Sequence, residues 1–264
     1  MNARCMGVIS LSSDLLAREI PIMESLRLSS CDDAVGPWIH RSLWAGDHPK
    51  AEPIKDEVRE QFPYLDQVTS DNFRTEQILS VRIFCASRGG YIRPHRDWTG
   101  SERAFTRLHI PLQTNGEALN SEDDSVYHMG VGEVWYLDGS RPHCGGCFHE
   151  SPRIHLILDF APDIPLTELF RDSACISAAP QPTTVNRDPL TSRQLEAIHG
   201  LAGIVTEKNL SPTLNLLSLV HFDRQVTSAS AYDWLITIAG QSPDPALLSR
   251  AKQLKSAYLG PGWS

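Results

Sequence analysis

Histidine and aspartate stand two residues apart in the segment 91–98, at His95 and Asp97. Residues two apart on an extended strand project from the same face, so the imidazole and the carboxylate can converge on one point. Such a pair also occurs on ordinary protein surfaces, and alone it is weak evidence. His143 follows in a Pro-His-Cys-Gly-Gly segment at the end of a predicted strand. Two histidines and one carboxylate are the ligand set of non-haem Fe(II) oxygenases, so we predict that these three residues form a catalytic metal centre.

Arg153 adds a cation to this set, ten residues after His143 and at the head of an apolar strand. A guanidinium inside the same barrel offers the planar, two-pronged partner that a dicarboxylate requires. The four residues together favour an oxygenase with a dicarboxylate co-substrate. The alternative is that His143 belongs to an ordinary loop and that Arg153 lies at the surface.

Short strands punctuated by turns must position these residues. A pattern of short apolar runs and turn signals such as Asn115-Gly116 favours a sandwich or barrel. On one of these strands Arg107 and His109 share one face, and Leu108 and Ile110 share the other. The predicted strands span 78–86, 91–97, 106–114, 125–129, 133–138 and 153–161.

The pattern becomes helical after a loop at 178–189 that is rich in Pro, Thr and Asn. Thr191 and Gln194 have the spacing of a capping box. Three further helices are predicted after Ser211-Pro212, Ser228 and Asp244-Pro245, because these residues favour helix starts. We therefore expect a β domain over 1–180, with a mixed N-terminal segment, and a helical module over 190–264.

The composition excludes several classes of protein. The 264 residues carry a net charge of −8, and no run of Lys or Arg exceeds two residues, so nucleic acid is not an expected partner. No apolar stretch approaches the roughly 20 residues that span a bilayer, and the N-terminus lacks an apolar secretory core. We expect a cytoplasmic protein without a membrane partner.

Six cysteines in a chain of this length do not form a disulfide framework, and we expect them to be reduced. Cys144-Gly-Gly-Cys147 has the spacing of a zinc or redox pair, but no second pair completes four ligands. A glycine loop is the more frequent interpretation of this segment.

The chain resembles the Fe(II)- and 2-oxoglutarate-dependent hydroxylases of free L-proline and related cyclic amino acids. The similarity is greatest to the proline 3-hydroxylase type, within the aspartyl/asparaginyl hydroxylase-like group. It runs from about residue 36 to about residue 255. The motifs that carry it are Pro94-His95-Arg96-Asp97, the segments 36–44, 121–129, 132–138, 218–221 and 232–236, His143, Arg153 and Asp159-Phe160.

The resemblance implies a mainly β protein with a double-stranded β-helix core, that is, a cupin-like jelly roll. It also implies that His95, Asp97 and His143 hold Fe(II) and that Arg153 pairs with the distal carboxylate of 2-oxoglutarate. His155 stands where many relatives in the wider superfamily have a hydroxyl residue. The second contact to 2-oxoglutarate therefore stays open, with His155 as a candidate.

Three residues are candidates for contact with the substrate. The resemblance adds Arg107 as a residue that binds a carboxylate, and its alternative is a solvent-facing arginine. Arg93 lies two residues before His95, on the metal-facing side of a regular strand, where relatives have an apolar residue; it could mark a different substrate. His40, near Trp44, fits a substrate pocket and ordinary packing equally well.

These features predict an enzyme that hydroxylates an unactivated C–H bond of a free amino acid, most readily L-proline or a relative such as L-pipecolate. The reaction would consume O2 and convert 2-oxoglutarate to succinate and CO2. Two alternatives stay open: an oxygenase acting on another amino acid or a peptide residue, and a non-catalytic cupin-like protein that binds a metal or ligand. Arg153 argues against the second, since a metal-only module needs no buried guanidinium. A homodimer is compatible with the sequence.

Overall fold

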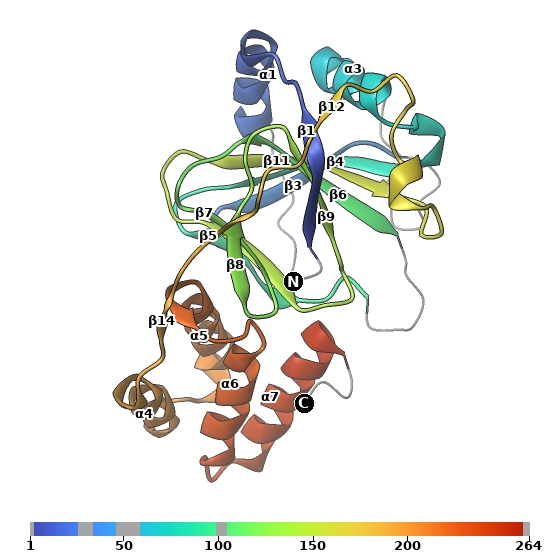
Figure 1. The fold of residues 1–264 in the computed structure, drawn as a ribbon. Helices are drawn as coiled ribbons and strands as arrows, with labels where there is room; N and C mark the ends of the chain where they lie inside the picture. The colour runs from blue at the N-terminus through green and yellow to red at the C-terminus, as the bar shows by residue number, and fades with distance from the viewer. Residues whose placement is uncertain (1–2, 26–33, 46–58, 99–104, 261–264) are drawn as a thin grey trace.

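A seven-stranded antiparallel sheet forms one wall of the fold. The computed structural model of the chain describes residues 3–25, 34–45, 59–98 and 105–260, and all elements below lie in these ranges. The helices α1 (Ser13–Ser25) and α3 (Pro63–Asn72) lie at the top of Figure 1, beside this sheet. In spatial order its strands are β12 (Ile176–Ser177), β1 (Arg4–Ile9), β9 (Glu133–Leu137), β6 (Thr106–Gln113), β11 (Arg153–Phe160), β4 (Ile78–Ala86) and β3 (Trp38–Ala45).

A second antiparallel sheet of six described strands forms the opposite wall. A short parallel pair, β14 (Asp188–Pro189) with β15 (Arg224–Gln225), lies apart from both sheets. The strands of the second sheet are β13 (Thr183–Thr184), β8 (Ser125–His128), β7 (Ala118–Glu122), β10 (His143–Cys147), β5 (Gly90–His95) and β2 (Ala34–Val35).

The strands β4 to β11 define the topology. The order β9-β6-β11-β4 in the larger sheet faces the order β8-β7-β10-β5 in the smaller one, so the chain crosses repeatedly from sheet to sheet. This connectivity is that of a jelly roll. The predicted fold class, a mainly β jelly-roll core followed by helices, is confirmed.

The sequence predicted six of these eight strands and missed β7 and β10. The interpretation of residues 144–147 as a glycine loop is wrong, because the Cys-Gly-Gly-Cys segment lies within β10 between β5 and β7. A Cβ atom on Gly145 would lie 2.6 Å from Nη1 of Arg153, so the strand needs a glycine where this side chain crosses. Because glycine has no side chain, this segment lacks the alternation of apolar and polar residues that identifies a strand.

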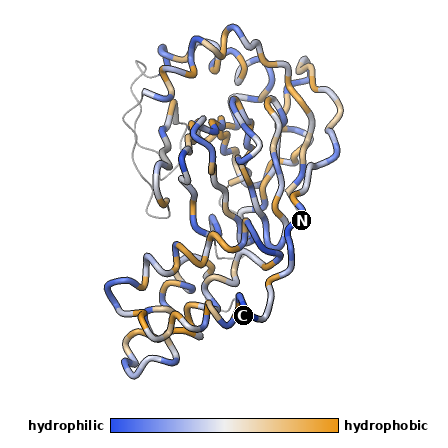
Figure 2. The backbone as a smooth tube through the Cα atoms, turned by 90° about the vertical axis from the view of Figure 1, so that its left-hand side faces the viewer, coloured by the Kyte–Doolittle hydropathy of each residue, from blue (hydrophilic) through white to orange (hydrophobic). Residues whose placement is uncertain are grey.

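The two faces of the larger sheet are chemically different. Leu108 and Ile110 on β6 and Leu156 and Leu158 on β11 belong to the main apolar cluster, together with residues of α1 and α3. The alternate residues of the same strands face the smaller sheet, and many are polar, as Arg153 and its neighbours show. Figure 2, coloured by hydropathy, shows hydrophobic and hydrophilic residues mixed throughout the sheets. The interior between the two sheets is thus available for a site.

Helix α1 holds α3 in place through one buried carboxylate. Glu19 is 4% exposed, and its Oε1 and Oε2 accept hydrogen bonds from the backbone amides of Tyr64 (2.7 Å) and Leu65 (3.2 Å). These amides belong to the first turn of α3, where no intrahelical acceptor exists and a negative charge is favourable.

The C-terminal part of the chain is helical and has an apolar cluster of its own. It lies at the bottom of Figure 1, at the opposite end of the sheets from α1 and α3. Its helices are α4 (Ser192–Gly200), α5 (Leu210–Asp223), α6 (Ser230–Gly240) and α7 (Pro245–Leu259). Short 3-10 turns lie at Thr75–Gln77 (η1), Leu166–Glu168 (η2), Leu201–Gly203 (η3) and Glu207–Asn209 (η4).

Two of the four predicted helix starts are confirmed. Thr191 forms the capping box with Gln194, and Asp244 caps α7 by accepting a hydrogen bond from the amide of Ala246. The other two predictions are wrong. Helix α5 begins at Leu210, ahead of Ser211-Pro212, because η4 leads directly into it, and α6 begins after Ala229 without a side-chain cap.

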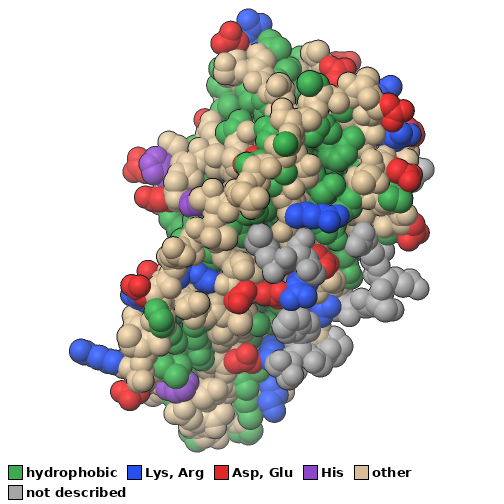
Figure 3. Space-filling model, viewed as in Figure 1, with side chains coloured by type: hydrophobic (Ala, Val, Ile, Leu, Met, Phe, Trp, Pro, Cys, Tyr) green, Lys and Arg blue, Asp and Glu red, His purple; other side chains and the backbone are tan. Residues whose placement is uncertain are grey.

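The cysteines of the described ranges carry free thiols, as predicted; these are Cys5, Cys85, Cys144, Cys147 and Cys175, and Cys31 lies outside the described residues. No helix in the described part of the chain has the length and apolarity needed to cross a membrane. On the face drawn in Figure 3, acidic and basic side chains are interspersed.

Candidate active site

The structure brings the three predicted metal ligands together at one end of the smaller sheet. His95 ends β5, Asp97 follows two residues later, and His143 begins β10 as the register partner of His95. One ligand atom from each residue lies within 4.8 Å of the other two. Nε2 of His95 is 4.0 Å from Oδ1 of Asp97, and Nε2 of His143 is 3.7 Å from Oδ2. Strand pairing therefore converts a long sequence separation into a compact cluster.

Both histidines are oriented by the same device. Nδ1 of His95 lies 2.8 Å from the carbonyl oxygen of Arg93, and Nδ1 of His143 lies 2.9 Å from that of Arg141. A carbonyl oxygen only accepts, so each Nδ1 carries the proton and donates. The lone pair is then on Nε2, which faces Asp97. This is the tautomer and the backbone support typical of metal-ligating histidines.

The charges of the cluster also suit a cation. Burial and the neighbouring His95 lower the pKa of His143 to about 4, so its imidazole is neutral near pH 7. Burial opposes ionisation of Asp97, but Arg107 and the two histidines outweigh it and hold the pKa of the carboxyl well below its usual range. Oδ2 of Asp97 is buried and has no hydrogen-bond partner among the described residues. A neutral imidazole and an ionised carboxylate with an unsatisfied oxygen fit a divalent metal ion.

Arg107 holds the other oxygen of Asp97. Its Nη1 donates to Oδ1 of Asp97 at 2.7 Å, and its Nε donates to Oδ1 of Asp159 at 2.7 Å. Asp159 is 1% exposed and also accepts from Ser80 (3.0 Å) and forms an ion pair with Arg82. Predicted as a substrate contact, Arg107 is therefore placed between two carboxylates of the protein.

Two further charged residues of the site, Asp159 and Arg82, have no role predicted from the sequence. The signal was present in the strand periodicity, since Asp159 lies on the same face of β11 as Arg153. Arg82 stands on β4 two residues from Ser80, the register partner of Asp159. A charged residue at an inward position of a jelly-roll strand indicates a functional or paired group, because an isolated buried charge is costly.

Arg153 lies on the inner face of the larger sheet and reaches across to the smaller one. Its Nη2 donates to Oδ1 of Asn120 at 2.6 Å, and its Nη1 donates to the carbonyl of Leu119 at 3.3 Å. Burial lowers the pKa of Arg153 to about 10, which leaves it a cation at neutral pH. His155 lies 3.2 to 3.3 Å from this guanidinium, and burial together with Arg153 holds its pKa well below the usual range.

Of the remaining two predicted residues, the structure describes only the side chain of Arg93. The guanidinium of Arg93 donates to Oδ1 of Asn215 on α5 and to the hydroxyl of Tyr258 on α7, each at 2.7 Å. The side chain of His40 lies outside what the structure describes; its backbone pairs with Phe84.

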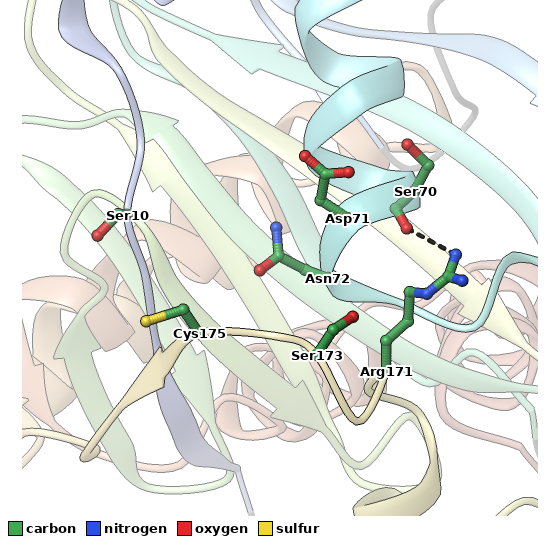
Figure 4. A pocket seen from close by; sticks show the side chains of 7 residues that line it. All are labelled: Ser10, Ser70, Asp71, Asn72, Arg171, Ser173 and Cys175. Carbon is green, nitrogen blue, oxygen red and sulfur yellow. Dashed lines mark hydrogen bonds between the residues drawn. The ribbon is translucent and has the colours of Figure 1, made fainter.

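A separate pocket of about 680 Å³ lies away from these residues. It is formed by the end of α3, the loop 171–175 and Ser10, and its lining includes Asp71, Arg171 and Cys175 (Figure 4). No residue of the metal-ligand cluster lines it, so we assign it no part in the site.

The chain is similar to known proteins over nearly its whole length. Residues 16–162 match the family described as aspartyl/asparaginyl β-hydroxylase, and residues 167–261 match the C-terminal family of L-proline 3-hydroxylase. The chain is 30% identical to L-proline cis-4-hydroxylase of Rhizobium meliloti (strain 1021), over 98% of this chain and 96% of that protein. It is 28% identical to L-proline cis-3-hydroxylase 2 of a Streptomyces species, over 97% and 94%.

A solved prolyl-4-hydroxylase of Pseudomonas putida superposes with a TM-score of 0.39 at 16% identity, covering 61% of this chain and 93% of that one. That similarity is too low to add to the argument. The sequence matches suffice: the chain belongs to the aspartyl/asparaginyl β-hydroxylase family and, within it, to the proline hydroxylases, as the sequence predicted. It is an enzyme, a dioxygenase of this group.

Proposed function

We propose that this enzyme hydroxylates an unactivated C–H bond of a free amino acid, L-proline or a cyclic relative such as L-pipecolate, with Fe(II), 2-oxoglutarate and O2. The observation that carries the proposal is the convergence of His95, Asp97 and His143. Arg153 is buried in the same jelly-roll interior. The relatives named above act on L-proline, which supports the substrate class.

His95, Asp97 and His143 would hold the iron. The Nε2 atoms of His95 and His143 and the unsatisfied Oδ2 of Asp97 would be its protein ligands. With its co-substrates bound, the metal supplies the oxidation of the C–H bond, and the protein has to hold one substrate carbon close to it.

Arg153 would bind the distal carboxylate of 2-oxoglutarate. Its guanidinium has the planar fork that matches a carboxylate, and burial strengthens the interaction because no water competes. The hydrogen bonds to Asn120 and Leu119 fix the direction of the side chain. His155, neutral and beside Arg153, would line the same binding site and form a further hydrogen bond to the co-substrate.

Arg107 would act on Asp97 more than on the substrate, because two of its nitrogens already bind the carboxylates of Asp97 and Asp159. The neighbouring Arg82 then becomes the candidate for the substrate carboxylate. Its side chain is 20% exposed, and its Nε is buried without a hydrogen-bond partner among the described residues. Arg93 and His40 stay predictions as substrate contacts.

A mass-spectrometric screen tests the proposal. The purified enzyme is incubated with Fe(II), 2-oxoglutarate and ascorbate, and with each of the common amino acids, L-pipecolate or a proline-containing peptide. We expect L-proline or L-pipecolate to gain one oxygen atom with stoichiometric formation of succinate, and His143→Ala to give neither product. Hydroxylation of the peptide alone would transfer the function to a peptide substrate, and no product with any of them would contradict the proposal.

A further inference from the structure

Three C-terminal helices contact β5, the strand that ends at the proposed metal ligand His95. The hydroxyl of Tyr232 on α6 donates to the carbonyl of Pro94 at 2.7 Å, immediately before His95. The backbone amide of Arg96 donates to the carbonyl of Tyr258 at the end of α7, at 2.9 Å. The peptide groups on both sides of His95 are thus hydrogen-bonded to helices that lie more than 130 residues away in the sequence.

The side chain of Arg96 extends this connection to the second metal-binding strand. Its Nη1 donates to the carbonyl of Leu259 at 2.9 Å, and its Nε donates to the carbonyl of Ser140 in the turn before His143. The last carbonyls of a helix carry a partial negative charge and have no intrahelical donor, so a guanidinium is favourable there. One arginine, placed between two predicted metal ligands, therefore joins the end of α7 to the turn before the third.

The same strand is also held further back by α5. The hydroxyl of Tyr91 donates to the carbonyl of Asn215 at 2.6 Å, and Arg93 binds the side chain of the same residue. Tyr232 is fully buried and Tyr91 is 2% exposed, so water does not compete for these hydrogen bonds.

We propose that these helices act as a clamp on β5, defined by Tyr232, Arg96 and the end of α7, and that the clamp positions His95 and Asp97 for metal binding. Tyr232 and Arg96 are positioning residues in this inference, because neither is itself a ligand. The inference rests on the proposed function in that it takes the three ligands to bind a divalent metal. Clamp formation and metal binding favour the same arrangement of β5, so each stabilises the other by the same free energy.

The test measures metal affinity without turnover. Co(II), a spectroscopic substitute for Fe(II), is titrated into the metal-free, full-length protein, and the visible absorption and the heat of binding are recorded. Tyr232→Phe removes one hydroxyl and keeps the ring, and we expect the affinity to fall about fivefold, the equivalent of one hydrogen bond. Arg96→Gln removes the contacts to both carbonyls and should lower the affinity about tenfold or more.

Tyr64→Phe is the matched control. The hydroxyl of Tyr64 accepts a hydrogen bond from the amide of Ser12 at 2.6 Å, beside α1 and far from β5. We expect this variant to lose some thermal stability, less than Tyr232→Phe because its hydrogen bond is exposed, and to bind Co(II) as the wild type does. This readout separates a positioning role from a general loss of stability.

Two kinds of result would overturn the inference. One contradicts the clamp alone, and the other contradicts the metal centre on which it rests. If the wild type binds Co(II) and both clamp variants bind it equally well, or if Tyr64→Phe weakens binding as much as they do, the clamp is wrong and the metal centre stands. If the wild type binds no Co(II), or if binding survives in Asp97→Ala, the proposed metal centre is wrong and the clamp falls with it.

Discussion

The two faces of strand β11 bury different chemistry over the same eight residues. Leu156 and Leu158 point outward into the apolar cluster under α1 and α3, and both are fully buried. Arg153, His155 and Asp159 point inward between the sheets and are 1 to 3% exposed. Burying charged groups costs free energy unless they are paired, so the outer face stabilises the fold, and we propose that the inner face holds the metal and the co-substrate.

The inner face is itself divided. Near the end of β11, Asp159 forms ion pairs with Arg82 and Arg107, and Arg107 continues to Asp97. At the beginning of β11, Arg153 is held by an amide and a backbone carbonyl. In the proposed function, the first group supports the metal ligands and Arg153 binds the co-substrate. The predictions below test this division, in the order of their expected effect on activity.

Loss of a metal ligand should have the largest effect. We expect His95→Ala, Asp97→Ala and His143→Ala each to abolish turnover and to weaken Fe(II) or Co(II) binding by more than about 100-fold, because two remaining ligands do not hold a labile cation against water. Product formation and metal titration measure the two effects. Thermal stability should fall little in the two histidine variants and more in Asp97→Ala, which leaves Nη1 of the buried Arg107 without its carboxylate. Full activity in any one variant would remove that residue from the ligand set.

Arg153 should be required for 2-oxoglutarate and dispensable for the metal. A desolvated pair between a guanidinium and a carboxylate loses roughly 2–5 kcal/mol when one partner is truncated, which corresponds to about thirty-fold to several thousand-fold in affinity. The KM for 2-oxoglutarate in Arg153→Ala should rise by this factor, with Co(II) affinity unchanged. Arg153→Lys should recover only part, since an ammonium lacks the planar fork. An unchanged KM in Arg153→Ala would remove the co-substrate role.

Asp159→Asn should act through Arg107 on the metal ligand Asp97. The amide keeps the shape of the carboxylate and loses the charge that holds Arg82 and Arg107. We expect metal affinity to fall about tenfold, as for other groups that support metal ligands, and the KM for 2-oxoglutarate to stay within about twofold of wild type. Metal titration and steady-state kinetics check the two parts. The reverse pattern would place Asp159 in the co-substrate site.

The sequence predicted the parts of this architecture that depend on local patterns. Short apolar runs bounded by turn signals predicted β4, β6 and β11, and the two-residue spacing of His95 and Asp97 predicted that these side chains converge. The pairing of β5 with β10 brings His143 to the same point. The capping residues Thr191 and Asp244 were sufficient to place two helix starts because a cap satisfies its own helix.

What the sequence could not predict depends on distant partners. The sequence indicated a loop at 144–147 because glycines show no alternation of side chains. Gly145 is needed there to make room for Arg153, which lies on another strand. The sequence also could not predict that the guanidinium of Arg93 binds Asn215 and Tyr258, which follow 122 and 165 residues later. Contacts between such distant segments leave no mark on the local pattern of a strand.

Leu158→Ala should have the smallest effect on activity. It tests the outer face of β11, as Asp159→Asn tests the inner face. The two residues are adjacent on β11, but Leu158 faces the apolar cluster, between Val81 on β4 and Leu108 on β6. Truncation of a fully buried leucine costs about 2–5 kcal/mol of unfolding free energy, because transfer energy is lost and a cavity remains. Urea denaturation should therefore show a large loss. At a temperature where the variant stays folded, its metal affinity and its KM for 2-oxoglutarate should match the wild type, since the outer face touches neither ligand. A stable Leu158→Ala variant that had lost metal affinity would show that the two faces of the sheet are coupled.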